Sequence, residues 1–473
     1  MILKGYLFSF LYGALCLLLG GILHKCGVPQ KITRKIVHIL VGFEWIILYN
    51  FVGATYHFLI VCIAFLLLLL FVYKKRMMPM IQSEGDNAPG TVYYAVAMSI
   101  MALVMLFIPA MILPFGIGVF CTSLGDGLAG LVGQAITGRG NPRIFGKKTL
   151  AGALSNLVVS FAVTFVFSSI FSMRLGAFAC IAIAILALEL ELFSVKGLDN
   201  ITITLGVSFF SYSLSAFSSI WEYIVPILLT PLLIAFVLKK KALTISGTIA
   251  AIILDVAISA SLGNAGFLIL LSFLVLGLAT DKIKKKADKL RQSEKRGALQ
   301  VLCNGGVGAA LALAFLFTGE RCFLVGFCAS LAEALSDTAA SGIGAMSKRT
   351  YDIFKFKKCD NGISGGVSLI GTLAAICGSV LIAAISFAVG LLEVGDALLV
   401  CSVGFTGCFF DSFLGSLAQV KFRCNVCGKI TEKKLHCGVE TRYHCGLRFL
   451  DNSFVNLLGT LFSGALAVVL YAV

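Results

Sequence analysis

The chain contains a long series of uninterrupted apolar segments, each about 17–25 residues long. A helix of that length crosses the roughly 30 Å hydrocarbon core of a bilayer. In lipid, backbone amides must be hydrogen-bonded within the protein, which allows only helices or a closed barrel. Barrel strands would be shorter and would alternate between apolar and polar residues. The sequence therefore predicts an all-α polytopic integral membrane protein.

Composition agrees with lipid as the solvent. Of the 473 residues, 59% are hydrophobic and 13% are charged, whereas a soluble chain carries about 25% charged residues. The net charge of +15 is confined to short loops, where basic residues hold a loop in the cytosol. We therefore expect the lipid bilayer as a partner and no nucleic acid.

About sixteen spans are predicted, in two halves of about eight. The halves are 1–238 and 242–473, separated by the basic loop at Lys239–Lys241. The predicted spans are 5–24, 37–53, 57–73, 91–108, 112–135, 150–170, 175–192, 201–218, 222–238, 244–261, 263–280, 298–317, 321–345, 363–385, 392–418 and 453–472.

Alternate loops differ sharply in charge. One set carries nearly all the basic residues, and the other set carries only Arg174 and Arg321. The positive-inside rule places the basic loops in the cytosol and, for an even number of spans, both termini outside. We predict a multi-pass protein of the cell membrane whose polar helix ends face the cytosol.

An acidic residue lies within the fifth predicted span. Asp126, Gly130 and Gln134 recur every four residues and share one helix face. A carboxylate in a membrane helix is costly and indicates a functional site. The glycines around it, including Gly125, allow a backbone or a phosphate to approach closely. The alternative is a small-residue packing face with one paired aspartate.

Basic residues precede two of the predicted helices. Lys147 and Lys148 lie just before the sixth span, where helix amides favour an anion. Arg34 and Lys35 precede His38 at the start of the second span. Both groups could bind nucleotide phosphates. The alternatives are ordinary cytosolic anchoring for the lysines and helix packing for the histidine.

Carboxylates and an amide occur where the seventh span reaches the cytosol. Glu191, Asp199 and Asn200 could hold a metal ion or accept a proton from a substrate hydroxyl.

The second half carries a parallel set of polar residues at predicted cytosolic helix ends. Asp411, Gly415 and Gln419 repeat the spacing of Asp126, Gly130 and Gln134. The other members of the set are Asn304, Asp337, Asn361, Ser364, Ser368, Asn452 and Asn456. Magnesium–phosphate sites are built from a few carboxylates together with substrate phosphates.

A cytosolic loop at 421–450 is rich in cysteine and histidine. Cys424 and Cys427 have the spacing of a structural zinc site. Cys437 and either His444 or Cys445 would complete four ligands. The alternative is a reduced loop without metal.

Five segments of the first half match one known family in order: 34–38, 90–94, 124–130, 146–152 and 191–200. Residues from about 30 to 220 thus resemble the CTP-dependent polyprenol kinases, which include phytol and dolichol kinases. Residues 242–473 resemble the family that contains phytyl-phosphate kinase. That match runs through 295–305, 336–338, 361–372, 411–419 and 455–456, but Gly342 stands where the family usually has an acidic residue.

Together these resemblances imply a bifunctional isoprenoid-alcohol kinase. CTP would phosphorylate a prenol of the phytol, farnesol or geranylgeraniol type to the monophosphate and then to the diphosphate, with Mg²⁺ as cofactor. The alternatives are a CTP-dependent cytidylyltransferase acting on a lipid phosphate and a secondary transporter. A transporter would hold its polar groups near the midplane of the membrane.

Roles follow for the candidate residues. In the first half, Asp126 with Glu191 or Asp199 would hold Mg²⁺, and His38 or Asp199 would accept the proton of the alcohol. Arg34, Lys35, Lys147 and Lys148 would neutralise phosphates, with Gly125 and Asn200 beside them. In the second half, Asp337 and Asp411 would hold the metal ion. The residues expected around phosphate there are Asn304, Asn361, Ser364 and Ser368.

Overall fold

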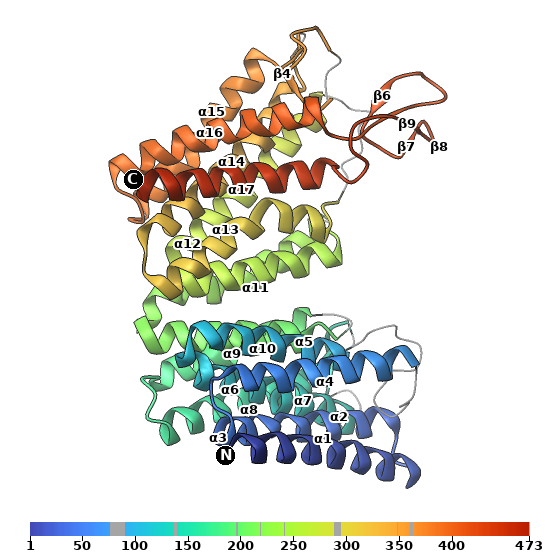
Figure 1. The fold of residues 1–473 in the computed structure, drawn as a ribbon, viewed down its shortest axis with the longest axis vertical. Coiled ribbons are helices and arrows are strands. Elements are labelled where there is room, and N and C mark those ends of the chain that lie inside the picture. The colour runs from blue at the N-terminus through green and yellow to red at the C-terminus, as the bar shows by residue number, and fades with distance from the viewer. Residues whose placement is uncertain are drawn as a thin grey trace. The chain divides into compact units, whose positions relative to one another are not determined.

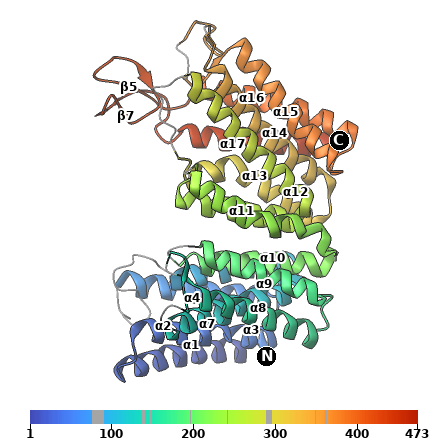
Figure 2. The same cartoon turned by 180° about the vertical axis from the view of Figure 1, so that it is seen from behind.

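The structure is a computed structural model that describes residues 1–75, 90–136, 140–146, 148–194, 197–217, 219–240, 242–287, 295–347, 349–359 and 363–472. Helices dominate it (Figures 1 and 2). The chain forms two compact units, Met1–Ile227 and Leu228–Val473. The boundary falls inside the span predicted at 222–238, upstream of the loop at which the sequence divides the chain.

The described residues of the first unit form ten α-helices with short connecting elements. Its helices are α1 (Ile2–Lys25), α2 (Gln30–Gly42), α3 (Glu44–Phe51), α4 (Tyr56–Lys75), α5 (Gly90–Phe107), α6 (Ile112–Phe120), α7 (Gly127–Ala135), α8 (Leu150–Ile170), α9 (Ala177–Phe193) and α10 (Asp199–Phe217). Between them lie the 3₁₀ turns η2 (Pro109–Met111) and η4 (Ile220–Tyr223), the π-helical segment η3 (Cys121–Asp126), and the strands β1 (Arg143–Phe145) and β2 (Lys148–Thr149).

Helix α11 (Ile224–Lys240) crosses the boundary into the second unit. The other helices of that unit are α12 (Ile245–Ala287), α13 (Ala298–Thr318), α14 (Arg321–Gly344), α15 (Leu369–Ala388), α16 (Val394–Leu417) and α17 (Asn452–Ala472). Its strands are β3 (Tyr351–Asp352), β4 (Gly366–Val367), β5 (Lys421–Arg423), β6 (Ile430–Thr431), β7 (Leu435–His436), β8 (Val439–Glu440) and β9 (Arg442–Cys445).

The prediction of a helical membrane protein is confirmed, but the count of sixteen spans is not. Among the described residues, twelve helices are long and apolar enough to cross a membrane. The segment 37–53 is divided between α2 and α3 at Phe43, and α9 has only 17 residues. Helix α10 carries buried hydroxyl groups along its length, including Thr204 and Ser208, which lower its hydropathy. The spans predicted at 244–261 and 263–280 fall within the single element α12.

Element α12 nevertheless consists of two helices joined by a sharp turn. Gly263 has φ 57° and ψ −143°, which is outside the helical region. Thr244 donates its backbone N–H to the carbonyl of Arg296, and Arg296 in turn pairs with Asp281 at 3.0 Å. In one straight helix, positions 244 and 281 would lie about 55 Å apart. Because both contact Arg296, the chain must fold back at Gly263.

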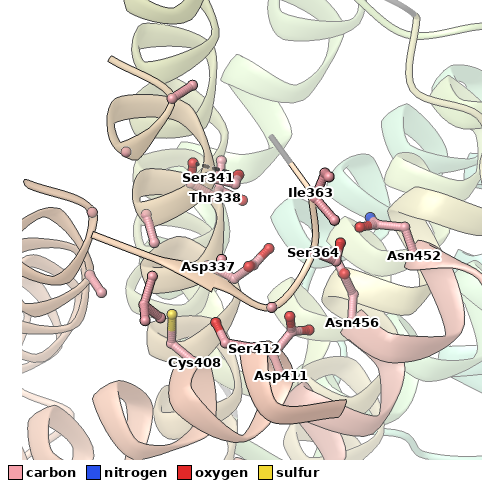
Figure 3. A pocket seen from close by; sticks show the side chains of 18 of the residues that line it. Asp337, Thr338, Ser341, Ile363, Ser364, Cys408, Asp411, Ser412, Asn452 and Asn456 are labelled. Atoms are coloured by element: carbon pink, nitrogen blue, oxygen red, sulfur yellow. Dashed lines mark hydrogen bonds between the residues drawn. The ribbon is translucent and has the colours of Figure 1, made fainter. Parts of the chain in front are cut away.

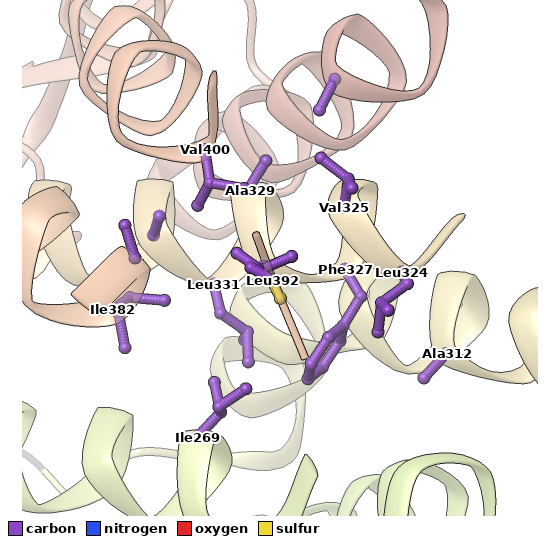
Figure 4. Close-up of a cluster of buried hydrophobic side chains, with 14 of the residues drawn as sticks. Ile269, Ala312, Leu324, Val325, Phe327, Ala329, Leu331, Ile382, Leu392 and Val400 are labelled. Carbon is purple, nitrogen blue, oxygen red and sulfur yellow. The ribbon is translucent and has the colours of Figure 1, made fainter. Parts of the chain in front are cut away.

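Each unit packs around one helical segment that is largely enclosed by other helices. In the second unit α14 packs against α12, α13, α15, α16 and α17, and Figure 4 shows Phe327 and Leu331 of α14 among apolar side chains from its neighbours. In the most apolar window of α14, 83% of the residues are buried, against 17% in α1. In the first unit the segment from Pro109 to Ala135 is the most enclosed, with 72% buried. Protein rather than lipid therefore surrounds these two segments.

The turn at Gly263 gives a stability test. Replacing Gly263 by alanine forces an L side chain into backbone space that is almost restricted to glycine, at a cost of about 1–3 kcal/mol. We expect Gly263→Ala to lower the thermal unfolding midpoint of the detergent-solubilised protein. The control is Gly306→Ala on α13, where an added Cβ meets no atom within 4 Å, so the midpoint should not fall. If the two variants have equal unfolding midpoints, residue 263 does not adopt the backbone conformation that requires glycine.

Candidate active sites

A buried cluster of charged side chains surrounds Asp126 in the first unit. The Asp126 side chain is 4% exposed and lies at the end of η3. The Lys35 ammonium, on α2, lies 2.6 Å from Asp126 Oδ2 and also donates to the Asp126 carbonyl at 3.2 Å. His38, one turn further along α2, places Nε2 at 3.7 Å from the same carboxylate. Two segments separated by 91 residues in sequence thus meet at one acidic group.

Lys148 on β2 joins the cluster to two further carboxylates. Its ammonium lies 2.6 Å from Glu191 Oε1, 3.5 Å from Asp199 Oδ2 and 3.9 Å from Asp126 Oδ1. Burial lowers the pKa of Lys148, but the three carboxylates outweigh burial and hold this pKa above its usual value. The described cluster thus contains three carboxylates and two ammonium groups. An additional cation would balance this charge.

The Nε2 edge of His38 faces the cluster. Its Nε2 lies 3.1 Å from the carbonyl oxygen of Thr122. Because a carbonyl only accepts hydrogen bonds, Nε2 carries a proton there and Nδ1 is the basic nitrogen of the neutral ring. The Tyr94 ring packs edge-on against His38, with 5.6 Å between ring centroids. This contact fixes the plane of the imidazole.

Two buried oxygens of the cluster have no hydrogen-bond partner. They are Glu191 Oε2 and Asn200 Oδ1, and oxygen ligands of this kind suit Mg²⁺. Arg34 is half-buried on α2. Gly125 faces α8, where an added Cβ would lie 2.8 Å from Ser160 Oγ. Lys147 lies outside the described residues.

The second unit contains a cavity of about 460 Å³ at the ends of its helices. Figure 3 shows Asp337, Asp411, Ser364 and Asn456 grouped around this space. Asn304 and Ser368 also line it, and Asn304 accepts a hydrogen bond from Asn456 at 3.0 Å. Most of the polar residues predicted in the second half therefore gather at one cavity; Gly415 and Gln419 do not line it, and Asn361 lies outside the described residues. Asp281, Arg296, Glu432 and Lys433 add further charges to the lining.

Glu333 belongs to this group of carboxylates and was missed by the sequence analysis. It lies one helical turn before Asp337 on α14 and is 1% exposed. Neither Glu333 oxygen has a hydrogen-bond partner, and Asp411 Oδ2 also has none. An added Cβ at Gly459 would lie 2.5 Å from Glu333 Oε1 and 3.4 Å from Asp411 Cβ, so α17 approaches both residues. The spacing of four between Glu333 and Asp337 was the available signal.

These unpartnered oxygens fit a divalent cation. Buried carboxylates are unfavourable unless they are paired or coordinate a metal ion, and hard oxygen ligands favour Mg²⁺. Gly342, where the related family usually has an acidic residue, lies beside α12. An added Cβ there would lie 3.2 Å from Thr280 Cβ, and Gly342 is absent from the cavity lining.

The two units repeat one local arrangement around Asp126 and Asp337. Three residues after each aspartate, a backbone carbonyl (Ala129 or Ala340) contacts a glycine in the first turn of the following helix, Gly152 or Gly371. That helix follows a two-stranded antiparallel hairpin in both units. Thr149 and Ser368 cap the helix by accepting the N–H of that same glycine.

The helices around this arrangement also correspond. Helix α8 packs on α7 and α9, and α10 packs on α5, α6 and α9. In the second unit, α15 packs on α14 and α16, and α17 packs on α13, α14 and α16. Asp126 thus corresponds to Asp337, and the spacing that Asp126 shares with Asp411 does not reflect a structural correspondence. Asp411 lies on α16, the counterpart of the helix that carries Glu191.

The cysteine-rich loop gathers four potential metal ligands. They are Cys424, Cys427, His436 and Cys437, whose ligand atoms all lie within 4.8 Å of one another. Three of the four predicted ligands are among them. The fourth is His436 rather than His444 or Cys445, because β7 brings His436 beside the thiols.

Comparisons with known proteins show which family the chain belongs to. The model of the integral membrane protein family DUF92 matches residues 228–464, half of the chain. The chain belongs to this family. It is also 32% identical to phytol kinase of Synechocystis sp. over 196 residues, which cover 39% of this chain and 80% of the relative.

Two further relatives are membrane or plastid proteins. The chloroplastic protein VTE6 of Arabidopsis thaliana is 29% identical over 195 residues, 39% of this chain and 59% of the relative. An uncharacterized membrane protein of Methanocaldococcus jannaschii is 29% identical over 254 residues, 52% of this chain and 93% of the relative. No solved structure matches the chain. The resemblance to phytol and polyprenol kinases is thus supported by named relatives.

The unpartnered state of Glu333 gives a direct test of cation binding. Because Glu333→Gln removes a buried charge, we expect the variant to be at least as stable to heat as the parent protein in EDTA. Mg²⁺ should raise the unfolding midpoint of the parent but raise that of Glu333→Gln much less. Glu393→Gln is the control, because its side chain is 83% exposed. If Glu333→Gln and Glu393→Gln respond equally to Mg²⁺, Glu333 is not a ligand.

Proposed function

We propose that the chain phosphorylates an isoprenoid alcohol twice, once in each unit. The first unit transfers the γ-phosphoryl group of CTP to the hydroxyl of the alcohol and releases CDP and a proton. The second unit transfers another phosphoryl group from CTP to the resulting monophosphate. The observation that carries this proposal is the repeated placement of Asp126 and Asp337 beside a capped helix start, with further carboxylates around each. The relative named phytol kinase supports the substrate class.

In the first unit, Asp126, Glu191 and Asp199 would hold Mg²⁺, which supplies charge neutralisation for the nucleotide phosphates. Lys35 and Lys148 already contact these carboxylates. When a triphosphate enters, their ammonium groups are positioned to bind its oxygens. Arg34 and Lys147 directly precede Lys35 and Lys148 in the sequence and would add positive charge. Phosphoryl transfer depends mainly on such positioning and neutralisation.

His38 distinguishes the first reaction from the second. An alcohol must lose a proton during phosphorylation, and we assign its acceptance to Nδ1 of His38, the nitrogen that stays basic when Nε2 donates to Thr122. No histidine is among the described residues that line the second cavity. A phosphate monoester needs no such base, because its second pKa is about 6 and it is already ionised near neutral pH. The difference in residues therefore favours the alcohol as substrate of the first unit and the monophosphate as substrate of the second.

The second cavity has the groups required for two anionic substrates. Asp337, Asp411 and Glu333 would hold Mg²⁺. Arg296 and Lys433 supply positive charge, and the amides of Asn304 and Asn456 supply neutral hydrogen bonds. A membrane location suits both reactions, because the isoprenoid tail stays in lipid while its head group and CTP meet at the cytosolic helix ends. Fusion of the units keeps the intermediate in the same membrane region.

A product assay with γ-labelled CTP separates the two steps. With purified protein and phytol, farnesol or geranylgeraniol, we expect labelled monophosphate and diphosphate. Asp126→Asn should lower phosphorylation of the alcohol roughly 100-fold or more but should still convert added monophosphate to diphosphate. Asp337→Asn should accumulate the monophosphate.

Exposed carboxylates provide controls for that assay. Glu222→Gln in the first unit and Glu393→Gln in the second should leave both products unchanged. Diphosphate formation at the parental rate by Asp337→Asn would show that the second transfer does not depend on Asp337, and would contradict its assignment to the second unit. Release of pyrophosphate instead of CDP would identify a cytidylyltransferase.

The proposed base gives a separate test. We expect His38→Gln to lower kcat for the alcohol about 10²–10⁴-fold, the usual contribution of a general base, without changing the second transfer. His57→Gln is the matched control, since His57 interacts with Tyr6 on α1 away from the cluster. An equal loss of both transfers in His38→Gln would indicate a structural role.

A further inference from the structure

The loop between α16 and α17 contains a distinct side-chain cluster outside the helices. Its counterpart in the first unit, between α9 and α10, spans only residues 194–198. The loop of the second unit spans 418–451 and carries all of β5 to β9. The common helical arrangement therefore does not require this insertion.

The first pair of ligands has the backbone geometry of a metal knuckle. Cys424 and Cys427 lie in the turn between β5 and β6. The turn is closed by a hydrogen bond from Gly428 N–H to the Cys424 carbonyl at 3.0 Å, and Gly428 has φ 71°. The N–H of Val426 points at Cys424 Sγ at 3.4 Å. Backbone amides directed at sulfur stabilise a thiolate, the form of cysteine that binds a metal ion.

The second pair lies in a strained turn. His436 ends β7, and Cys437 and Gly438 form the two-residue turn to β8, with φ 53° and 75°. Position one of such a turn favours Asn, Asp or Gly, so a cysteine there is energetically unfavourable. In this turn Cys437 Sγ lies 3.2 Å from His436 Nδ1, and Cys427 Sγ, from the first turn, lies 3.5 Å from the same nitrogen. Ligand atoms around tetrahedral zinc are separated by about the same distance, given bonds of 2.0–2.3 Å.

We propose that Cys424, Cys427, His436 and Cys437 bind one structural Zn²⁺ ion, and that this ion holds Glu432 and Lys433 at the second cavity. Three thiolates and one imidazole form a closed tetrahedral set, which is the composition of structural zinc sites. The metal-binding part of the proposal is independent of the proposed kinase activity. Its consequence for the second phosphoryl transfer rests on the proposed function.

The connection to the cavity runs through residues between the two ligand pairs. Glu432 follows β6 and accepts the backbone N–H of Ser364 at 2.6 Å. Lys421, on β5, donates to the Ser364 carbonyl at 3.2 Å. Side chains of this strand pair therefore hydrogen-bond both the N–H and the carbonyl of Ser364, which lines the cavity. Lys433 also lines the cavity, so release of the metal would free a cation and a carboxylate from their positions beside the substrate.

Metal analysis of four single variants tests the site without reference to activity. We expect about one Zn²⁺ per chain in the purified parent protein, and its loss in His436→Asn and Cys437→Ser. His444→Asn and Cys445→Ser are matched controls from the same loop, outside the ligand set, and should retain the ion. Loss of zinc should also lower the thermal unfolding midpoint. Equal zinc content in His436→Asn and His444→Asn, or a parent protein without zinc, would overturn the site.

Product analysis tests the consequence separately. With γ-labelled CTP, His436→Asn should lose at least about tenfold in conversion of monophosphate to diphosphate, the usual cost of an altered supporting shell. Formation of the monophosphate from the alcohol should stay at the parental rate. If zinc is lost and the second transfer is unchanged, the metal does not position Glu432 and Lys433. If the parent makes no labelled lipid at all, only the proposed function fails, and the metal measurements stand.

Discussion

The cost of placing carboxylates within a membrane protein governs the arrangement of both units. A charged side chain facing lipid is strongly unfavourable, so it must lie inside the bundle with partners. Asp126 and the pair Glu333 and Asp337 therefore lie on the most enclosed segment of their unit. Glycines on α15 and α17 let these helices approach α14 closely, as at Gly378 beside Ser336 and Gly459 beside Glu333. The packing that shields these carboxylates from lipid also brings polar groups from neighbouring helices beside them.

The units balance their buried charge differently. In the first unit, Lys35 and Lys148 contact the carboxylates directly. In the first unit Lys148 directly precedes the helix cap, whereas in the second unit the uncharged Val367 has that position. Oxygens of Glu333 and Asp411 in the second unit lack hydrogen-bond partners. The second site thus has a greater need for a bound cation. Its basic groups, Arg296 and Lys433, come from loops at the cavity mouth, where a second phosphate group would be held.

Much of this organisation is predictable from the sequence, because hydrophobic length and loop charge directly reflect the bilayer. The candidate residues near helix ends, such as Asp126, Lys148 and Glu191, do lie together. The count of sixteen spans is not confirmed, because α2 and α3 form a broken segment and α10 buries hydroxyl groups inside the protein. Window hydrophobicity contains no information on which polar face is internal.

The remaining differences depend on tertiary contacts. Glu333 lies in an apolar stretch, and only the approach of α16 and α17 joins it to Asp411. A spacing of four recurs in any helix, so the spacing that Asp126 and Asp411 share does not identify corresponding residues. The correspondence with Asp337 depends on the capped helix that follows each aspartate. Likewise, sequence spacing permits His436 or His444 as a metal ligand, and the turn at Cys437 selects His436.

In the function that we propose, one chain contains two nucleotide sites built on the same arrangement of helices. Calorimetric titration of the purified protein with a non-hydrolysable CTP analogue and Mg²⁺ measures the number of sites directly. We expect two bound nucleotides per chain in the parent protein and one in either Asp126→Asn or Asp337→Asn. A single bound nucleotide in the parent protein, abolished by one substitution and unaffected by the other, would contradict the claim.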